Sequence, residues 1–328
     1  MRGLAARLKP DLYVLLIIST MALASLAPVR GEAAVVVGWA TKLGIGLVFF
    51  LHGARLSRQA VARGLTHWRL HLLVLGTTFG LFPLLGLGLA ALPAVLTPSA
   101  LAPGIVLLCC LPSTVQSSIG FTAIARGDVA AAVASATASN LLGVMLTPVL
   151  AALTLHGTGG GLSMQAVQVI ALQLLAPFAA GQLLRGWIGP WITVHAKLLS
   201  WTDRGAILLV VYSAFSAAVV AGLWREVTGL DLARLLVICA VLLAVVLGFT
   251  VFAARALKFN KADEIAIVFC GSKKSLASGA PMAAVLFPPA LVGPMILPLM
   301  IFHQLQLMAC AAIAQAYASR TEPETAQG

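Results

Sequence analysis

Two adjacent lysines, Lys273 and Lys274, stand in the middle of an apolar segment that is long enough to cross a membrane. A lysine at the centre of a membrane helix costs about 3 kcal/mol on insertion scales. Small residues and a proline surround the pair between Gly271 and Pro281, and they favour a locally open helix. Because unpaired backbone groups are tolerated at membrane depth only inside protein or beside water, the segment predicts a broken helix at a solute site. The less specific interpretation is an interfacial loop whose lysine side chains reach water.

A second interruption lies in an earlier apolar segment, where Pro112 is followed by a polar run. The next apolar segment carries further hydroxyl and amide side chains, and two of them, Thr137 and Asn140, lie about one helical turn apart. Oxygen atoms of this kind are ligands of hard cations. They predict a candidate site for an alkali cation such as sodium, and for no other metal, at Ser117, Ser118, Thr137, Ser139 and Asn140. For any one of these residues, helix packing by small polar side chains is the alternative.

The last apolar segment contains His303 together with Gln304 and Gln306, and one helical face can carry His303 and Gln306. An intramembrane histidine is either a proton relay or a hydrogen-bonded packing residue. Lys42, deep in an earlier segment, is expected to face a cavity. The complete set of residues predicted to bind substrate or ion is Gln116, Ser117, Ser118, Thr137, Ser139, Asn140, Lys273, Lys274, Ser275, His303 and Gln304.

Other polar residues predict no chemistry. Asp263 and Glu264 are expected to pair with Lys258 or Lys261 at the surface, with little energetic weight. The sequence lacks a nucleophile elbow, a zinc-protease motif and a phosphate-binding loop, so we predict no enzyme activity and no cofactor beyond a sodium ion or proton. The five cysteines lie in apolar segments and are expected to pack there.

The composition indicates an all-α integral membrane protein. Of the 328 residues, 60% are hydrophobic and only 9% are charged, and the mean hydropathy is +1.02, whereas soluble domains carry about 25% charged residues. Segments of about 20 apolar residues can span a bilayer. Ten such segments are predicted, at residues 12–29, 33–53, 70–91, 103–125, 129–155, 166–184, 205–223, 235–254, 264–287 and 293–318.

The basic residues orient these ten segments. With both termini in the cytoplasm, fifteen of the 21 lysines and arginines fall on the inside, and only Arg30, Arg225 and Arg234 fall on the outside. Cytoplasmic loops of membrane proteins carry such an excess of positive charge. We therefore predict a multi-pass membrane protein with both termini in the cytoplasm, with lipid as a partner and no nucleic acid partner. The Ala- and Leu-rich composition suggests a bacterial source, and hence the inner membrane, while the oligomeric state stays open.

The two interruptions occupy the fourth and the ninth segment, which are matching positions in two halves of five segments each. Residues 1–156 are predicted to form the first repeat and residues 157–328 the second. An odd number of spans per repeat gives the halves inverted topology, and inverted repeats usually place a solute site near the midplane at broken helices.

Three stretches, at residues 49–57, 112–118 and 269–282, closely resemble the bile acid:sodium symporter-like family, in its branch without classical bile acid transport. The resemblance implies ten helices in two inverted five-helix repeats. Helices 1, 2, 6 and 7 would form a panel domain, and the other six would form a core domain in which broken helices 4 and 9 cross. Substrate would bind between panel and core, and the core would move in alternating access.

The chain departs from the family pattern at the sodium sites. Bile acid transporters of the family carry a glutamate, a glutamine and an asparagine on helix 9, where this chain has Phe269, Lys273 and Lys274, and an asparagine where this chain has Ser118. Two like charges about 4 Å apart repel by about 4 kcal/mol at an effective dielectric constant near 20. At least one sodium site should therefore be absent.

Three roles are open to the lysines: replacing the ion permanently, carrying a coupling proton, or binding an anionic substrate. We expect one lysine in the former ion site and the other toward the cavity. The predicted function is a secondary active transporter that moves a small organic anion by alternating access, coupled to sodium or protons. The alternative is a non-transporting membrane regulator or receptor that retains the fold.

Overall fold

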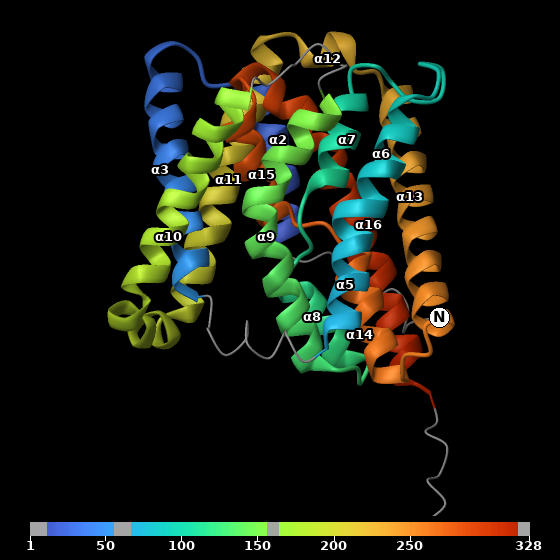
Figure 1. The fold of residues 1–328 in the computed structure, drawn as a ribbon. Coiled ribbons are helices and arrows are strands. Elements are labelled where there is room, and N and C mark those ends of the chain that lie inside the picture. The colour runs from blue at the N-terminus through green and yellow to red at the C-terminus, as the bar shows by residue number, and fades with distance from the viewer. Residues whose placement is uncertain (1–11, 56–66, 156–163, 321–328) are drawn as a thin grey trace, which may run out of the picture.

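The computed structural model describes residues 12–55, 67–155 and 164–320, and all regular elements in these ranges are helices (Figure 1). In chain order they are α2 (Leu12–Leu26), α3 (Gly31–Arg55), α5 (Trp68–Gly76), the π-helix η1 (Thr77–Leu81), α6 (Phe82–Ala90), α7 (Ala102–Cys110), α8 (Gln116–Ile124), α9 (Val129–Leu155), α10 (Met164–Val194), α11 (Ala196–Val220), α12 (Leu223–Glu226), α13 (Gly229–Ala256), α14 (Lys261–Gly271), α15 (Leu276–Leu286) and α16 (Pro289–Ala318).

Within these ranges, six helical stretches are long and apolar enough to cross a membrane. They are α3, the continuous stretch from α5 to α6, α9, α11, α13 and α16. The protein is thus an all-helical, multi-pass membrane protein. The count of ten crossings and the two inverted repeats stay predictions, and the boundary between the repeats, at residues 156 and 157, lies outside the described residues.

Both interruptions expected from the sequence are present. Helix α7 ends at Cys110 and α8 begins at Gln116, while α14 ends at Gly271 and α15 begins at Leu276. The backbone of Leu111, just before Pro112, is extended, as expected for a residue that precedes proline. Ser275 caps α15, because its hydroxyl accepts a hydrogen bond from the Ser278 amide at 3.2 Å.

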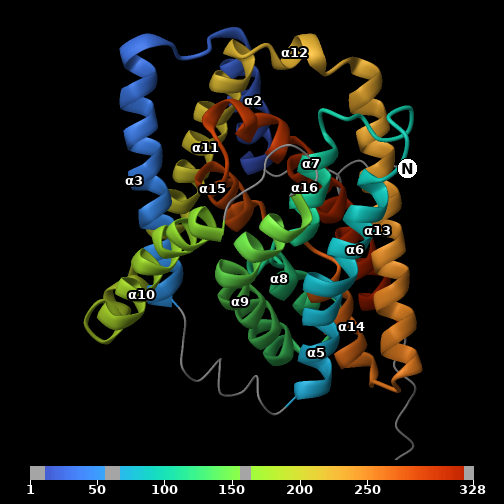
Figure 2. The ribbon, with the colours of Figure 1, turned by 45° about the horizontal axis from the view of Figure 1, so that its top comes forward.

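The helices form two groups. In both views α3 and α10 lie on one side of the molecule, and α5, α6, α13 and α14 lie on the other (Figures 1 and 2). Helices α2, α3, α10 and α11 pack together. Glycines allow the close contact of α3 with α10: a Cβ atom at Gly53 would lie 2.0 Å from the Phe178 carbonyl oxygen, and one at Gly181 would lie 2.0 Å from the Phe50 carbonyl oxygen. Small residues serve the same purpose in other membrane helix pairs.

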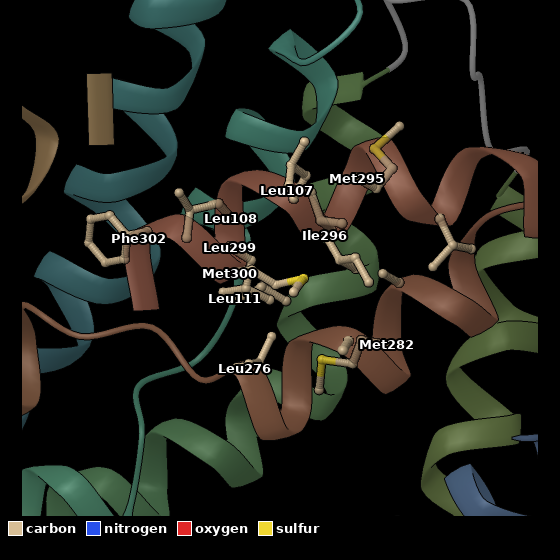
Figure 3. Close-up of a cluster of buried hydrophobic side chains, with 14 of the residues drawn as sticks. Leu107, Leu108, Leu111, Leu276, Met282, Met295, Ile296, Leu299, Met300 and Phe302 are labelled. Carbon is tan, nitrogen blue, oxygen red and sulfur yellow. The ribbon is translucent and has the colours of Figure 1, made fainter. Parts of the chain in front are cut away.

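A cluster of apolar side chains joins the broken helices to α16 (Figure 3). It fixes the end of α7 and the start of α15 against one long helix, so the two interruptions are held in place by tightly packed neighbours. The labelled members come from α7 and its end, from α15 and from α16, and they are Leu107, Leu108, Leu111, Leu276, Met282, Met295, Ile296, Leu299, Met300 and Phe302.

Two expectations about charged residues were wrong. The expected pairing of Glu264 with Lys261 is confirmed, at 2.7 Å. The expected surface position is wrong, because Glu264 is only 4% exposed and also accepts hydrogen bonds from Arg255 and from the Tyr317 hydroxyl. The buried Glu264 side chain thus connects α14 to α13 and α16 by hydrogen bonds. Lys42 does not face the cavity: it is exposed, and its ammonium lies 4.7 Å from the ring centre of Trp39.

Candidate solute site and cation site

A cavity of about 350 Å³ lies between two walls of helices. One wall comes from α2, α3, α10 and α11, and the other comes from the α7–α8 connection, α8, α9, α15 and α16. The cavity touches α3 only from Val48 to Arg55 and α11 only from Ser200 to Ile207. It therefore lies in the half of the molecule where α3 ends and α11 begins.

Two helices begin at this cavity. Gln116 and Ser117, the first residues of α8, line it, and so do Ser275, Leu276, Ala277 and Ser278 at the start of α15. The first amide groups of a helix have no acceptor within their own helix. Together with the helix dipole, they favour a negatively charged ligand.

The opposite wall carries charged side chains. Arg55 and Asp203 form an ion pair there, with side chains 28% and 13% exposed. The guanidinium of Arg204 lies 5.1 Å from the ring centre of Tyr13 and 5.3 Å from that of Trp201. Since the ion pair is neutral overall, Arg204 gives this wall a net positive charge.

The predicted site residues divide between the cavity and the protein interior. Gln116, Ser117, Thr137, Asn140, Ser275 and His303 line the cavity, whereas Ser118, Ser139, Lys273, Lys274 and Gln304 do not. The expectation that one lysine faces the cavity was wrong, because both lysines are 0% exposed. Gln306, which the sequence offered beside Gln304, is the glutamine that contacts His303, at 2.8 Å between Nε2 and Nδ1.

The two interrupted segments hydrogen-bond to each other. The Ser113 hydroxyl donates to the Cys270 carbonyl oxygen at 2.6 Å, and the Ser118 hydroxyl donates to the Phe269 carbonyl oxygen at 2.9 Å. The Ser275 amide donates to the Pro112 carbonyl oxygen at 2.9 Å. These bonds satisfy backbone groups that the helix ends leave free.

Three of the five residues proposed for sodium, Ser118, Ser139 and Asn140, hydrogen-bond to the interrupted segments. The Ser139 hydroxyl accepts a hydrogen bond from the Ser113 amide at 3.0 Å, and the Asn140 side-chain oxygen accepts one from the Ser278 hydroxyl at 2.7 Å. An oxygen that accepts one hydrogen bond keeps a second lone pair. These two oxygens are neutral donors that a cation can use, and no carboxylate among the five residues would compensate its charge.

Lys274 has a complete set of partners. Its ammonium donates to the carbonyl oxygens of Thr78 at 2.8 Å, Cys109 at 2.8 Å and Leu111 at 2.7 Å. The Gln306 side chain pairs with the backbone of the same residue, accepting from the Lys274 amide and donating to the Lys274 carbonyl, both at 2.8 Å.

Lys273 has different surroundings. Within the part of the chain that the structure describes, its amine has no hydrogen-bond partner. It lies 4.0 Å from the ring centre of Phe121 and 5.3 Å from that of Phe269. Cation–π attraction partly replaces hydration for a buried ammonium in such a position.

Sequence reasoning missed the charged wall and the partners of Lys274. Arg204 counted only as one of the basic residues on the inside, at the end of a predicted connector whose tryptophans indicate the membrane interface, and Asp203 carried no signal. For Thr78 the sequence contains one indication of a free carbonyl group: Pro83, five positions later in an apolar helix, has no N–H group to donate.

Comparisons with known proteins agree with this architecture. The model of the SBF-like CPA transporter family matches residues 11–319. The Pseudomonas aeruginosa protein named "Uncharacterized protein PA2026" is 58% identical over 98% of this chain and 96% of its own length. The Escherichia coli K12 protein named "Putative symporter YfeH" is 51% identical over 97% of this chain and 96% of its own length.

A more distant relative is "Sodium/bile acid cotransporter 7" of Rattus norvegicus, which is 26% identical over 81% of this chain and 79% of its own length. The family and these names indicate a transporter of a small molecule and not an enzyme. The match along nearly the whole chain shows that the protein belongs to the SBF-like CPA transporter family.

Proposed function

We propose that the protein is a secondary active transporter that moves a small organic anion across a bacterial inner membrane by alternating access. The observation that carries this proposal is the cavity between the two helix groups, where α8 and α15 both begin and Arg204 lies on the facing wall. Two helix N-termini and an arginine favour a carboxylate or a similar anion. The apolar side chains between them, such as Phe49, Leu141 and Val144, suit an organic body.

The two walls of the cavity belong to groups that can move relative to each other. Helices α2, α3, α10 and α11 would form the panel, and the remaining helices would form the core that carries both interruptions. A rocking movement of the core would expose the cavity first on one side of the membrane and then on the other. The ten crossings and two inverted repeats are part of this proposal.

Coupling is proposed to use sodium or protons. Ser117, Ser118, Thr137, Ser139 and Asn140 would hold a sodium ion, which would supply positive charge beside the substrate anion. Lys273 and Lys274 replace part of the sodium site that the resemblance implies, because they bring fixed amines to the crossing of the interrupted helices.

Flux through reconstituted liposomes tests the transport proposal. Labelled mono- and dicarboxylates and sulfonates would be offered under imposed sodium and proton gradients. We expect accumulation of at least one anion, and a loss of at least tenfold in Arg204→Gln. Lys42→Gln is the matched control, since Lys42 is a basic residue outside the cavity. If none of the tested anions shows gradient-driven flux but solutes still stabilise the protein, the result would favour a non-transporting regulator or receptor instead.

Thermal stability in detergent tests the coupling ion. Sodium is compared with potassium and choline at constant ionic strength and at several pH values. A ligand at 100 times its dissociation constant stabilises the folded state by about 2.7 kcal/mol, so occupied sites are visible. A rise specific to sodium, lost in Asn140→Ala, supports the sodium site. No sodium effect in the wild-type protein contradicts it and leaves proton coupling.

A further inference from the structure

The end of α7 leaves backbone carbonyl groups without helical partners. The last four carbonyl groups of any helix lack an intrahelical donor, and here the chain turns extended at Leu111. The Thr147 hydroxyl donates to the Cys110 carbonyl oxygen at 2.9 Å. The carbonyl oxygens of Cys109 and Leu111 point instead to Lys274. This helix end also carries the negative end of the helix dipole, which attracts a cation.

A third carbonyl group is freed by a local irregularity in the α5–α6 stretch. In the π-helix η1 the Phe82 amide donates to Thr77. The next residue is Pro83, which has no N–H group to offer to Thr78. The Thr78 carbonyl oxygen therefore accepts from Lys274, which is 196 positions away in the sequence.

The three carbonyl oxygens require a charged partner. All three lie 2.7 to 2.8 Å from the Lys274 nitrogen. A neutral amine has two N–H groups and an ammonium has three, so only the ammonium can donate to all three. The Phe82 ring, with its centre 4.0 Å from the nitrogen, adds a cation–π contact.

We propose that the carbonyl oxygens of Thr78, Cys109 and Leu111 form a binding site for a monovalent cation, which Lys274 occupies permanently with its own ammonium group. The Lys274 ammonium supplies the positive charge of this site, so no ion from solution is needed there. Lys273 differs, because no acceptor in the described residues surrounds its nitrogen. The inference rests on the proposed replacement of part of the sodium site by Lys274, and its failure would overturn that replacement. The site does not line the cavity, so the proposed anion transport is tested separately by flux.

Chemical rescue tests this inference. Lys274→Ala removes three carbon atoms and the nitrogen, which together correspond to n-propylammonium. We expect Lys274→Ala to unfold at a lower temperature than the wild-type protein in choline chloride. Added n-propylammonium chloride at equal ionic strength should restore much of the loss with saturation, and ethylammonium and n-pentylammonium should restore less.

Lys273→Ala is the matched control, since it creates a similar buried space that lacks the three acceptors. It and the wild-type protein should not respond to n-propylammonium. If Lys274→Ala is too unstable to purify in choline, it should be recovered as a monodisperse protein when n-propylammonium is present throughout. An unaltered unfolding temperature in Lys274→Ala, an equal response in Lys273→Ala, or recovery in neither salt overturns the proposal.

Discussion

At the scale of single residues, the lysine pair shows how two identical neighbours acquire different environments. Lys274 donates to three carbonyl oxygens, whereas Lys273 lies against two aromatic rings without an acceptor in the described part of the chain. When one partner of a buried hydrogen bond is removed, the other partner is left unsatisfied. When a buried amine without a hydrogen-bond partner is removed, no other group loses a hydrogen bond. The two positions should therefore respond differently to the same substitution.

Methionine substitutions separate the two positions because methionine keeps most of the apolar stem. Lys274→Met leaves three buried carbonyl groups unpaired and should destabilise the protein by about 2 kcal/mol or more. Lys273→Met should leave stability within about 1 kcal/mol of the wild-type value, or raise it. Thermal unfolding in one detergent measures both. Equal losses in the two variants would show that the environments do not differ in energy.

Gln306 should matter for stability, because its side chain pairs with both backbone groups of Lys274. Gln306→Leu leaves the buried Lys274 amide without a partner, at about 1–3 kcal/mol, and leaves the Lys274 carbonyl oxygen only a 3.4 Å contact with His303 Nδ1. We expect a clearly lower unfolding temperature. Gln304→Leu, two positions earlier on the same helix, is the control and should change it little. Similar effects of the two changes would contradict the role assigned to Gln306.

At the scale of elements, glycine positions decide how closely α3 and α10 approach. Gly53 and Gly181 each face a carbonyl oxygen of the other helix, with no room for a side chain. The interrupted helices add hydrogen bonds to the apolar packing around them, because side chains of one interrupted segment donate to carbonyl oxygens at the end of α14. Packing therefore holds the proposed panel together, and packing and polar contacts together hold the interruptions.

Alanine at two glycines of α10 tests the close approach. Gly181→Ala places a methyl group against the Phe50 carbonyl oxygen, and overpacking of this kind costs about 1–3 kcal/mol. Gly186→Ala meets nothing within 4 Å and should be neutral or stabilising by up to about 1 kcal/mol, since alanine favours a helix. The unfolding temperatures of the two variants should move apart. Stability unchanged in Gly181→Ala would argue against the tight α3–α10 contact.

At the scale of the whole molecule, the cavity lies in only one half, on the side where α3 ends and α11 begins. The distribution of basic residues assigns this end to the cytoplasm. The structure would then be the state of a transporter whose cavity lies toward the inside. The orientation is a separate proposal from the transport activity and has its own test.

Reporter fusions test the orientation. Green fluorescent protein at either terminus should fluoresce, because it folds in the cytoplasm, and alkaline phosphatase at the C-terminus should be inactive. Phosphatase inserted after Gly222, in the short segment between α11 and α12, should be active, since that connection is predicted to lie outside. An active phosphatase at the C-terminus together with a fluorescent protein at the N-terminus would refute the even number of crossings.

Much of this protein follows from the sequence alone, because apolar length and charge bias report directly on the membrane. Its membrane class, both helix interruptions and six of the predicted cavity residues needed only local signals such as Pro112, Ser275 and the polar run around Gln116. Such features depend on neighbours along the chain.

Only the tertiary structure decided what each side chain touches. The carbonyl partners of the Lys274 ammonium lie 163 to 196 positions away in the sequence, and Arg204 reaches the cavity because α11 packs against α2 and α3. The side chains of adjacent residues point in different directions. A backbone carbonyl group can accept from a lysine only where it has no N–H donor within its own helix. The roles of the two lysines were therefore set by distant backbone, which no local pattern around them records.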